Sequence, residues 1–169
     1  LEDTWEQLEI FGTTSTDAHG LFFNTFDDRI LVGNELGLVQ SLDEGKSWFY
    51  DATLPANVKV QRFVSEGNFI FALVDDSIYR KLEESSTFEK IADLKSDFAR
   101  NIAVVNDTIY VTTDLGPRFS AAANIYHDTD IDFLPALSLV NIKGRAVAIT
   151  SLNVISDKLI IGTDRRLFL

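Results

Sequence analysis

Short apolar runs separated by polar clusters recur along the whole 169-residue chain. The runs are rich in β-branched and aromatic residues, which is typical of strands. The best candidate for a helix, STFEKIADLKSDFAR (86–100), has no clear cap and its apolar spacing is irregular. The pattern therefore predicts an all-β protein, and its clearest strands are RILVG (29–33), NFIFALV (68–74), TIYVTT (108–113) and KLIIGT (158–163).

Each of these strands is the middle of a larger unit. A polar turn and an earlier apolar run precede it, and a third run follows it; the third runs are LGLVQ (36–40), DSIYRK (76–81), NIYH (124–127) and RLFL (166–169). A shift of 40 residues places SLDEGKSW (41–48) on KLEESSTF (81–88), and a shift of 129 places Gly33 on Gly162. The third unit fits only with a shift of 47, which predicts an insertion of about seven residues at 115–123.

A repeat of about 40 residues with about four strands is the signature of a β-propeller blade. Blades bury both faces against their neighbours, which explains why the strands are apolar on both sides. A β-sandwich with accidental self-similarity is the alternative. We expect one propeller domain or segment with about four blades, in approximate repeats 1–8 (partial), 9–50, 51–91, 92–134 and 135–169 (partial).

The segment 41–48 carries a recognisable motif. Its residues match Ser/Thr-x-Asp-x-Gly-x-Ser/Thr-Trp at every defined position, namely Ser41, Asp43, Gly45, Ser47 and Trp48. The chain therefore resembles the Asp-box (BNR, sialidase-like) β-propellers, which include sialidases, sortilin-type receptor domains and secreted bacterial repeat proteins. The resemblance implies a turn between the third and fourth strands of a blade, on the outer rim. Eroded copies stand at 81–88, at DTDIDF (128–133) and at the start of the chain, where Thr4 and Trp5 match the end of the motif.

The residues of the motif suit a structural turn. An Asp side chain accepts hydrogen bonds from nearby backbone N–H groups, and glycine permits a positive φ. Ser41 and Ser47 can cap backbone groups, and Trp48 is expected to return into the sheet as a large apolar anchor. We therefore expect Asp43 to hold the turn, and we assign it neither a catalytic nor a metal-binding role.

The phase of the repeat bears on ring closure. If the motif separates strands three and four, the chain opens on a fourth strand at Trp5 and stops after a third strand at RLFL. The first strand could then pair with the last and close a four-bladed ring. A piece of a larger propeller, or several copies that assemble one ring, are the alternatives.

Charge and composition limit the classes of partner that this chain is expected to bind. The chain has 26 acidic and 15 basic residues, a formal charge of −11, and no stretch that concentrates Lys and Arg. A phosphate backbone would be repelled by this field, so nucleic acid is not an expected partner. The chain has no Cys and no apolar run near 18 residues, so neither thiolate chemistry nor membrane insertion is expected.

We find no catalytic motif and expect no metal or cofactor. HDTDID (127–132) alternates acids as a calcium loop does, but Phe133 and Leu139 stand where an EF-hand needs Gly and Glu. His19 and His127 accompany no nucleophile motif. The family resemblance implies that sialidase activity needs an arginine triad, a Tyr nucleophile with a Glu, and an Asp. Arg62 and Arg100 fall in first-strand regions near the channel, but no Phe-Arg-Ile-Pro motif supports the triad.

The sequence thus favours a non-catalytic binding or scaffold propeller with a protein or glycan partner. The alternative is an excerpt or relative of a glycoside hydrolase propeller such as a sialidase. Insertions in repeat proteins tend to map to a binding face, so Arg118 and Phe119 in the 115–123 insertion are the expected partner-binding residues. The resemblance also favours an extracellular, cell-surface or periplasmic location.

Overall fold

The computed structural model describes residues 18–95, 99–113, 116–120, 124–135, 149–156, 158–163 and 167–168. Strands and turns make up these residues, and no helix occurs among them. The all-β prediction is therefore confirmed, and the segment 86–100 contains a strand instead of a helix. In the described part of the chain no helix has the length and apolarity needed to cross a membrane.

The described strands form four antiparallel sheets, in each of which the strands pair in chain order. The first two sheets have four strands each: β1 (Gly20–Asn24), β2 (Arg29–Asn34), β3 (Gly37–Ser41) and β4 (Phe49–Asp51), then β5 (Val60–Glu66), β6 (Phe69–Val74), β7 (Ser77–Leu82) and β8 (Glu89–Asp93). The third and fourth sheets comprise β9 (Ala99–Val105), β10 (Thr108–Thr113), β11 (Gly116–Ser120) and β12 (Phe133–Pro135), then β13 (Ile149–Ile155), β14 (Lys158–Thr163) and β15 (Leu167–Phe168).

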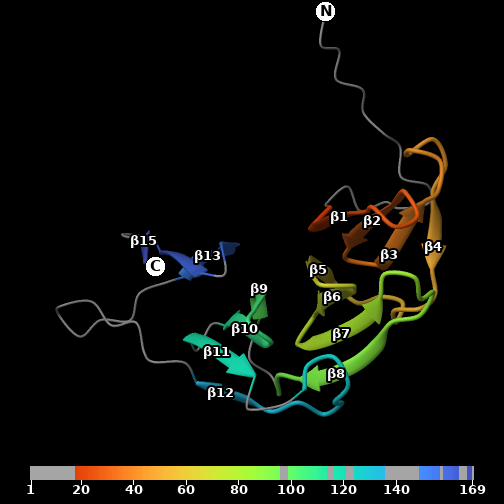
Figure 1. Cartoon of the computed structure of the whole chain (residues 1–169). Coiled ribbons are helices and arrows are strands. Elements are labelled where there is room, and N and C mark those ends of the chain that lie inside the picture. Colours follow the sequence, from red (N-terminus) through yellow and green to blue (C-terminus); the bar gives the residue numbers. More distant parts are fainter. Residues whose placement is uncertain are drawn as a thin grey trace, which may run out of the picture.

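The sheets follow one another along an arc, with β1, β5, β9 and β13 on its inner side (Figure 1). These innermost strands contact each other in succession: β1 contacts β5, β5 contacts β9, and β9 contacts β13. Repeated four-stranded meanders arranged around a centre are the blades of a β-propeller. The predicted fold class is therefore confirmed. The strand expected at Trp5, which would close a ring, lies outside the described residues.

Residues that tolerate a left-handed backbone make the tight hairpins. Asn106 and Asp107, between β9 and β10, have φ of 49° and 57°, and Asp75, between β6 and β7, has φ of 47°. Asn and Asp adopt this conformation more readily than other non-glycine residues, and two consecutive positive φ values match the twist of a hairpin. The polar turn clusters in the sequence thus mark the places where each strand reverses.

Consecutive residues of one strand are buried on opposite faces of the second sheet. Ile70 and Phe71 in β6 are both fully buried. Ile70 packs with Leu31 and Leu38 of the first sheet, whereas Phe71 belongs to the core shared with the third sheet. This two-sided burial confirms the physical reason given for apolar runs without strict alternation.

The sheets approach one another closely at Gly33. A Cβ on this β2 residue would lie 2.4 Å from the backbone oxygen of Val60, at the start of β5. No real Cβ atom tolerates such a contact, so the first and second sheets can pack only because residue 33 has no side chain.

The first strands share an irregularity. In the second, third and fourth sheets the pairing register shifts between Val60 and Arg62, between Ala99 and Asn101, and between Ile149 and Ser151. The innermost strands of these three sheets thus hold one extra residue at the same place, which is a β-bulge that twists the strand locally. The repeat therefore extends to backbone detail that the sequence pattern did not reveal.

The third sheet corrects one prediction. The strand expected at 124–127 is wrong, because the third strand of this sheet is β11 at 116–120. Residues 124–128 form a turn in which the N–H groups of His127 and Asp128 donate to the carbonyl of Asn124 at 3.0 and 2.7 Å. The apolar pair at 125–126 resembles a strand because Ile125 is fully buried in the core between the second and third sheets.

Candidate functional site

The predicted motif forms a turn between β3 and β4 that closes on itself. Ser41 ends β3 and is fully buried. Its Oγ accepts the N–H of Gly45 at 2.8 Å and donates to Oδ1 of Asp43 at 2.8 Å. Gly45 has a φ of 86° and Glu44 a φ of 61°, so two consecutive residues take the left-handed conformation that this reversal needs.

The carboxylate of Asp43 binds groups of the same turn. The hydroxyl of Ser47 donates to Oδ2 at 2.6 Å and its N–H donates to Oδ1 at 2.8 Å. These bonds from Ser47, followed by the bond from Ser41, lower the pKa of Asp43 to about 2. A carboxylate with this pKa is ionised at neutral pH and is poorly suited to act as a general acid.

Trp48 folds back over the turn. Its Nε1 donates to the carbonyl of Gly45 at 2.9 Å, and the side chain is half-buried. The expected anchoring deep in the sheet is therefore replaced by a cover over the turn, with the indole N–H satisfying a backbone carbonyl.

The eroded copy in the second sheet uses a different chemistry. Lys81 is the penultimate residue of β7, at the position that aligns with Ser41 in the repeat, and it is 4% exposed. Its Nζ donates to the carbonyl of Ser85 at 3.1 Å and lies 5.3 Å from the centre of the Phe88 ring. Burial, and next the neighbouring charge of Arg29, lower the pKa of Lys81.

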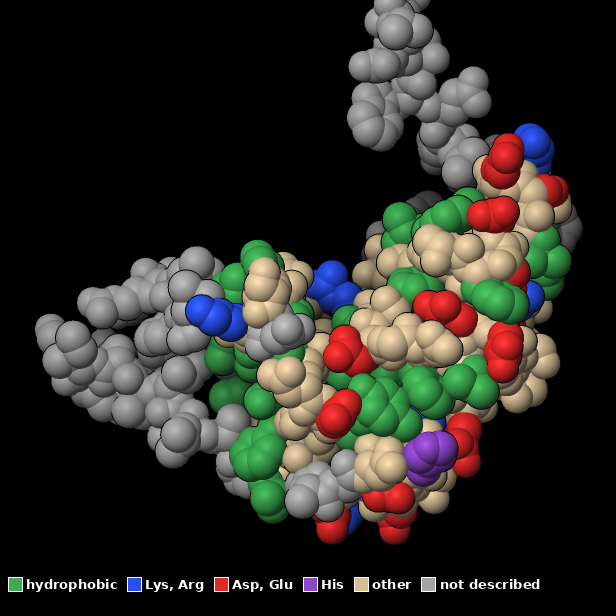
Figure 2. All heavy atoms as spheres, in the orientation of Figure 1, with side chains coloured by type: hydrophobic (Ala, Val, Ile, Leu, Met, Phe, Trp, Pro, Cys, Tyr) green, Lys and Arg blue, Asp and Glu red, His purple; other side chains and the backbone are tan. Residues whose placement is uncertain are grey.

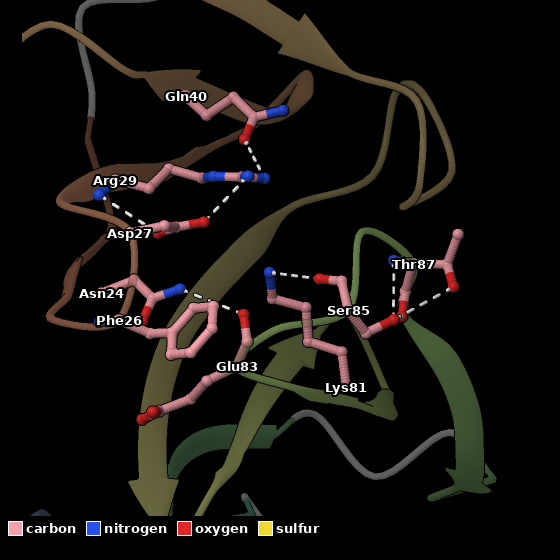
Figure 3. A network of polar contacts seen from close by, with 9 residues as sticks. All are labelled: Asn24, Phe26, Asp27, Arg29, Gln40, Lys81, Glu83, Ser85 and Thr87. Atoms are coloured by element: carbon pink, nitrogen blue, oxygen red, sulfur yellow. Dashed lines mark hydrogen bonds and ion pairs between the residues drawn. The ribbon is translucent and has the colours of Figure 1, made fainter.

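The turns of the first and second sheets also bind each other. Nδ2 of Asn24, which is fully buried, donates to the backbone oxygen of Glu83 at 3.2 Å. Nearby, Arg29 binds Asp27 at 2.9 Å and Oε1 of Gln40 at 2.9 Å. Figure 3 shows this group of contacts spread over both sheets. The 81–88 turn of the second sheet thus lies at a polar interface with the first sheet.

The expected partner-binding residues lie in a strand. Arg118 and Phe119 belong to β11, where Phe119 pairs with Tyr110 on one side and Leu134 on the other. Nη1 of Arg118 approaches the carbonyl of Phe133 at 3.4 Å. The predicted position of the insertion, 115–123, is therefore wrong: residues 116–120 form β11, and the long connection of this sheet is 121–132, between β11 and β12.

The described part of that connection packs against the second sheet. The guanidinium of Arg80, a β7 residue that is 5% exposed, donates to the carbonyls of Ile125 at 2.7 Å and Asp128 at 3.2 Å. Nη2 of Arg80 also binds Glu89 at 2.7 Å. The ring of Tyr126 lies 5.1 Å from that of Phe69. The segment therefore joins two blades.

The titratable residues weighed for catalysis or metal binding lie apart. His127 is exposed, and the carboxylate of Asp128 accepts the N–H of Asn124 at 2.7 Å. Nε2 of His19 lies 3.6 Å from Glu35. Within the described ranges, no group of three His, Asp or Glu side chains is arranged to hold a metal ion.

The two arginines expected near the channel lie on neighbouring innermost strands. Both Arg62 in β5 and Arg100 in β9 are exposed. Nε of Arg62 donates to Oδ1 of Asn101 at 3.0 Å, so this guanidinium ties two blades together. Arg145, Arg165 and Arg166 lie outside the described residues.

A cavity of about 450 Å³ lies at the outer part of the first sheet. The β2–β3 hairpin, β4 and the connection that follows β4 line it. The connection is fixed by the N–H of Asn57, which donates to the carbonyl of Leu36 at 3.0 Å. The lining is largely apolar, with Leu36, Leu54 and Pro55 among its members.

Tyr50 and Asp51, consecutive residues of β4, are among the residues that line this cavity. Tyr50 is 48% exposed, and Asp51 is 8% exposed. One carboxylate oxygen of Asp51 accepts the N–H of Thr53 at 2.8 Å, and within the described chain no cation lies within ion-pair distance of this carboxylate. An apolar cavity with an exposed aromatic residue in its lining can hold a ligand that has an apolar face.

The sequence analysis missed this cavity. The signal available was the stretch DATLPAN (51–57), which puts an acid, a proline and an amide directly after the aromatic pair Phe49–Tyr50. The stretch reads as an ordinary connection between repeats, because the contact between Asn57 and Leu36 that shapes it joins residues far apart in the repeat.

Comparison with known proteins supports the fold. No family model and no curated protein matches the chain. Among solved structures, the extracellular domain of the one-component system BT4673 from B. thetaiotaomicron superposes with a TM-score of 0.67 at 16% identity, over 96% of this chain and 22% of that one. YCF48 from Cyanidioschyzon merolae superposes with a TM-score of 0.57 at 13% identity, over 88% of this chain and 50% of that one. The chain thus spans half or less of the length of each, and its similarity to both is that of a β-propeller fold.

Proposed function

We propose that this β-propeller is a non-catalytic binding module that recognises a protein or glycan partner outside the cytoplasm. The observation that carries the proposal is the cavity of about 450 Å³ in the first sheet, whose largely apolar lining includes Tyr50, an aromatic residue that is 48% exposed. This volume is in the range of small-molecule sites, which is roughly 300–1,000 Å³.

The cavity suits a sugar ring. A pyranose offers an apolar face for an aromatic ring and hydroxyl groups that hydrogen-bond with polar groups at the cavity. The half-exposed Tyr50 and the amide-bearing Asn57 stand at the same cavity. These features support a glycan partner over a protein partner.

The alternative, a glycoside hydrolase, receives less support. Such enzymes need two carboxyl groups at a defined separation. Asp51 is the single carboxylate among the described residues that line the cavity. The carboxylate of Asp43 is occupied by its own turn.

The extracellular location is supported by one structural neighbour, which is described as an extracellular domain. Propellers commonly present binding sites on loops and rims, so a module of this kind fits a surface-exposed receptor or scaffold.

A glycan array probed with the purified chain tests the proposal. We expect binding to a defined subset of glycans, and we expect Tyr50→Ala to lose that binding while the chain keeps its melting temperature. Phe49→Ala is the matched control, since Phe49 is an adjacent exposed aromatic that does not line the cavity. Turnover of fluorogenic sialosides or glucans by the chain would instead support the hydrolase.

A further inference from the structure

The two faces of each sheet have distinct neighbours. We call the face toward the preceding sheet the rear face and the face toward the following sheet the front face. Phe22 in β1 lies 6.3 Å from Phe63 in β5, measured between ring centres. Phe22 is therefore on the front face of the first sheet and Phe63 is on the rear face of the second.

The repeat identifies equivalent rear-face positions in all four sheets. Each second strand has six residues, and its fourth residue pairs with one residue of the first strand. That first-strand residue is Leu21, Phe63, Ile102 or Leu152 in the successive sheets. The exposed fraction at this position is 6%, 2% and 7% in the second, third and fourth sheets, but 72% at Leu21.

A second position on the same face repeats the contrast. Phe23 lies two residues after Leu21 and is 53% exposed; at this position Val104 of the third sheet is 4% exposed and Val154 of the fourth is 36% exposed. The rear face of the first sheet thus carries two adjacent exposed apolar side chains, and the leucine stands at a position that is buried in the other three sheets. Exposed apolar side chains grouped in this way mark an interaction site.

The front face of the fourth sheet also carries apolar residues that are more exposed than their equivalents in other sheets. Ile155 ends β13 and is 60% exposed, whereas its equivalent in the first sheet, Asn24, is fully buried. Ile160, the third residue of β14, is half-buried, whereas Leu31 and Phe71 at the same place in β2 and β6 are fully buried. The space-filling view shows the arc open between its two end sheets (Figure 2).

We propose that the rear face of the first sheet, at Leu21 and Phe23, binds the front face of the fourth sheet, at Ile155 and Ile160, of a second copy of this chain. The partner follows from the repeat, because the internal contacts between sheets already pair a rear face with a front face of this same sequence. The contact is head-to-tail, so it uses a different surface on each copy and builds a ring or a chain of copies.

Charge sets a condition on this association. Two copies with a formal charge of −11 each repel one another, so an apolar contact between them is opposed at low ionic strength. Added salt screens this repulsion and leaves the apolar contact intact. The association therefore strengthens as the salt concentration rises.

Sedimentation velocity of the full chain over a wide range of concentrations tests the proposal. We expect a mass of more than one copy for the unaltered chain, and a mass of one copy for Leu21→Gln with Phe23→Gln and, separately, for Ile155→Gln. Leu42→Gln is the matched control, because Leu42 is 56% exposed in the β3–β4 turn and lies on neither face. This control keeps the mass of the unaltered chain.

Mixing the two altered chains sharpens the test. Each retains the face that the other has lost, so the mixture forms a complex of one copy of each and no larger species. A single copy for the unaltered chain at every concentration would overturn the proposal, as would an unchanged mass in both altered chains. Circular dichroism verifies that each altered chain is folded.

Discussion

Nζ of Lys81 donates to the backbone carbonyl of Ser85 at 3.1 Å. In the preceding blade the same two positions of the repeat are Ser41 and Gly45, and there the hydrogen bond runs in the opposite direction, from the N–H of Gly45 to Oγ of Ser41 at 2.8 Å. The turn at 41–48 is therefore closed by the hydroxyl of Ser41 and the carboxylate of Asp43, which accept hydrogen bonds, whereas the turn at 81–88 is closed by the buried ammonium group of Lys81, which donates one. The same position of the repeat closes the turn in both blades, but with a different functional group.

Acid should weaken the first of these turns in a defined pH window. The pKa of Asp43 is lowered from 3.8 to about 2 in the folded chain. A lowered folded pKa means that the ionised carboxylate stabilises the fold above the unfolded pKa, and that this contribution is lost as the pH falls toward about 2. Asp43→Asn should therefore lower the free energy of unfolding at neutral pH and flatten its decline across this window. Urea unfolding measured at several pH values checks this, and an unchanged pH profile would contradict it.

Gly33→Ala should be strongly destabilising. Its Cβ would lie 2.4 Å from the backbone oxygen of Val60, so the first and second sheets must separate. We expect a loss of about 2–4 kcal/mol in the free energy of unfolding. Gly67→Ala is the control: it has no atom within 4 Å but has a φ of 57°, so only backbone strain acts there. We expect about 1 kcal/mol for that strain, and equal losses at both positions would refute the clash.

Arg80 should not be replaceable by lysine. Its guanidinium reaches two carbonyls of the 124–128 turn and the carboxylate of Glu89 together, and the side chain is buried. A lysine cannot present this planar set of donors, so we expect Arg80→Lys to cost about 2–3 kcal/mol in denaturant unfolding. Lys90→Ala, which removes only an exposed ion pair with Asp93, should cost about 0.5 kcal/mol or less.

Trp48 should contribute less than a core tryptophan. Because its side chain is half-buried over the turn, we expect Trp48→Ala to cost about 1–2 kcal/mol, below the 3–5 kcal/mol typical of a fully buried aromatic. Trp48→Phe keeps the ring but removes the bond from Nε1 to Gly45, and should cost about 1 kcal/mol. Chemical denaturation distinguishes these values, and a loss above 3 kcal/mol for Trp48→Ala would show that the side chain anchors the core.

The sequence predicts the second strand of each blade well. TIYVTT and KLIIGT coincide with β10 and β14 residue for residue, because two-sided burial yields uninterrupted apolar runs between turn residues. The third strand of the third blade escapes detection. Its sequence, GPRFS, holds Pro117 and Arg118, whereas the apolar pair at 125–126 in the following turn mimics a strand.

Contacts between distant residues explain what the sequence could not show. The 40-residue repeat makes Lys81 the equivalent of Ser41, but only the packing of the two sheets shows that a buried lysine closes the second turn. The cavity depends on the hydrogen bond from the N–H of Asn57 to the carbonyl of Leu36, which joins the connection after β4 to the β2–β3 hairpin. Neither relationship has a local sequence pattern, so both follow from tertiary structure.

The central claim is that the Asp-box-like turn at 41–48 stabilises the first blade, whereas ligand recognition occurs at the cavity of the first sheet. The most direct test measures both the melting temperature and the binding of an oligosaccharide selected from the glycan array, in Asp43→Ala and Tyr50→Ala. The account predicts that Asp43→Ala lowers the melting temperature by several degrees with unchanged affinity, and that Tyr50→Ala loses binding with an unchanged melting temperature. Loss of binding in Asp43→Ala at an unchanged melting temperature would contradict it.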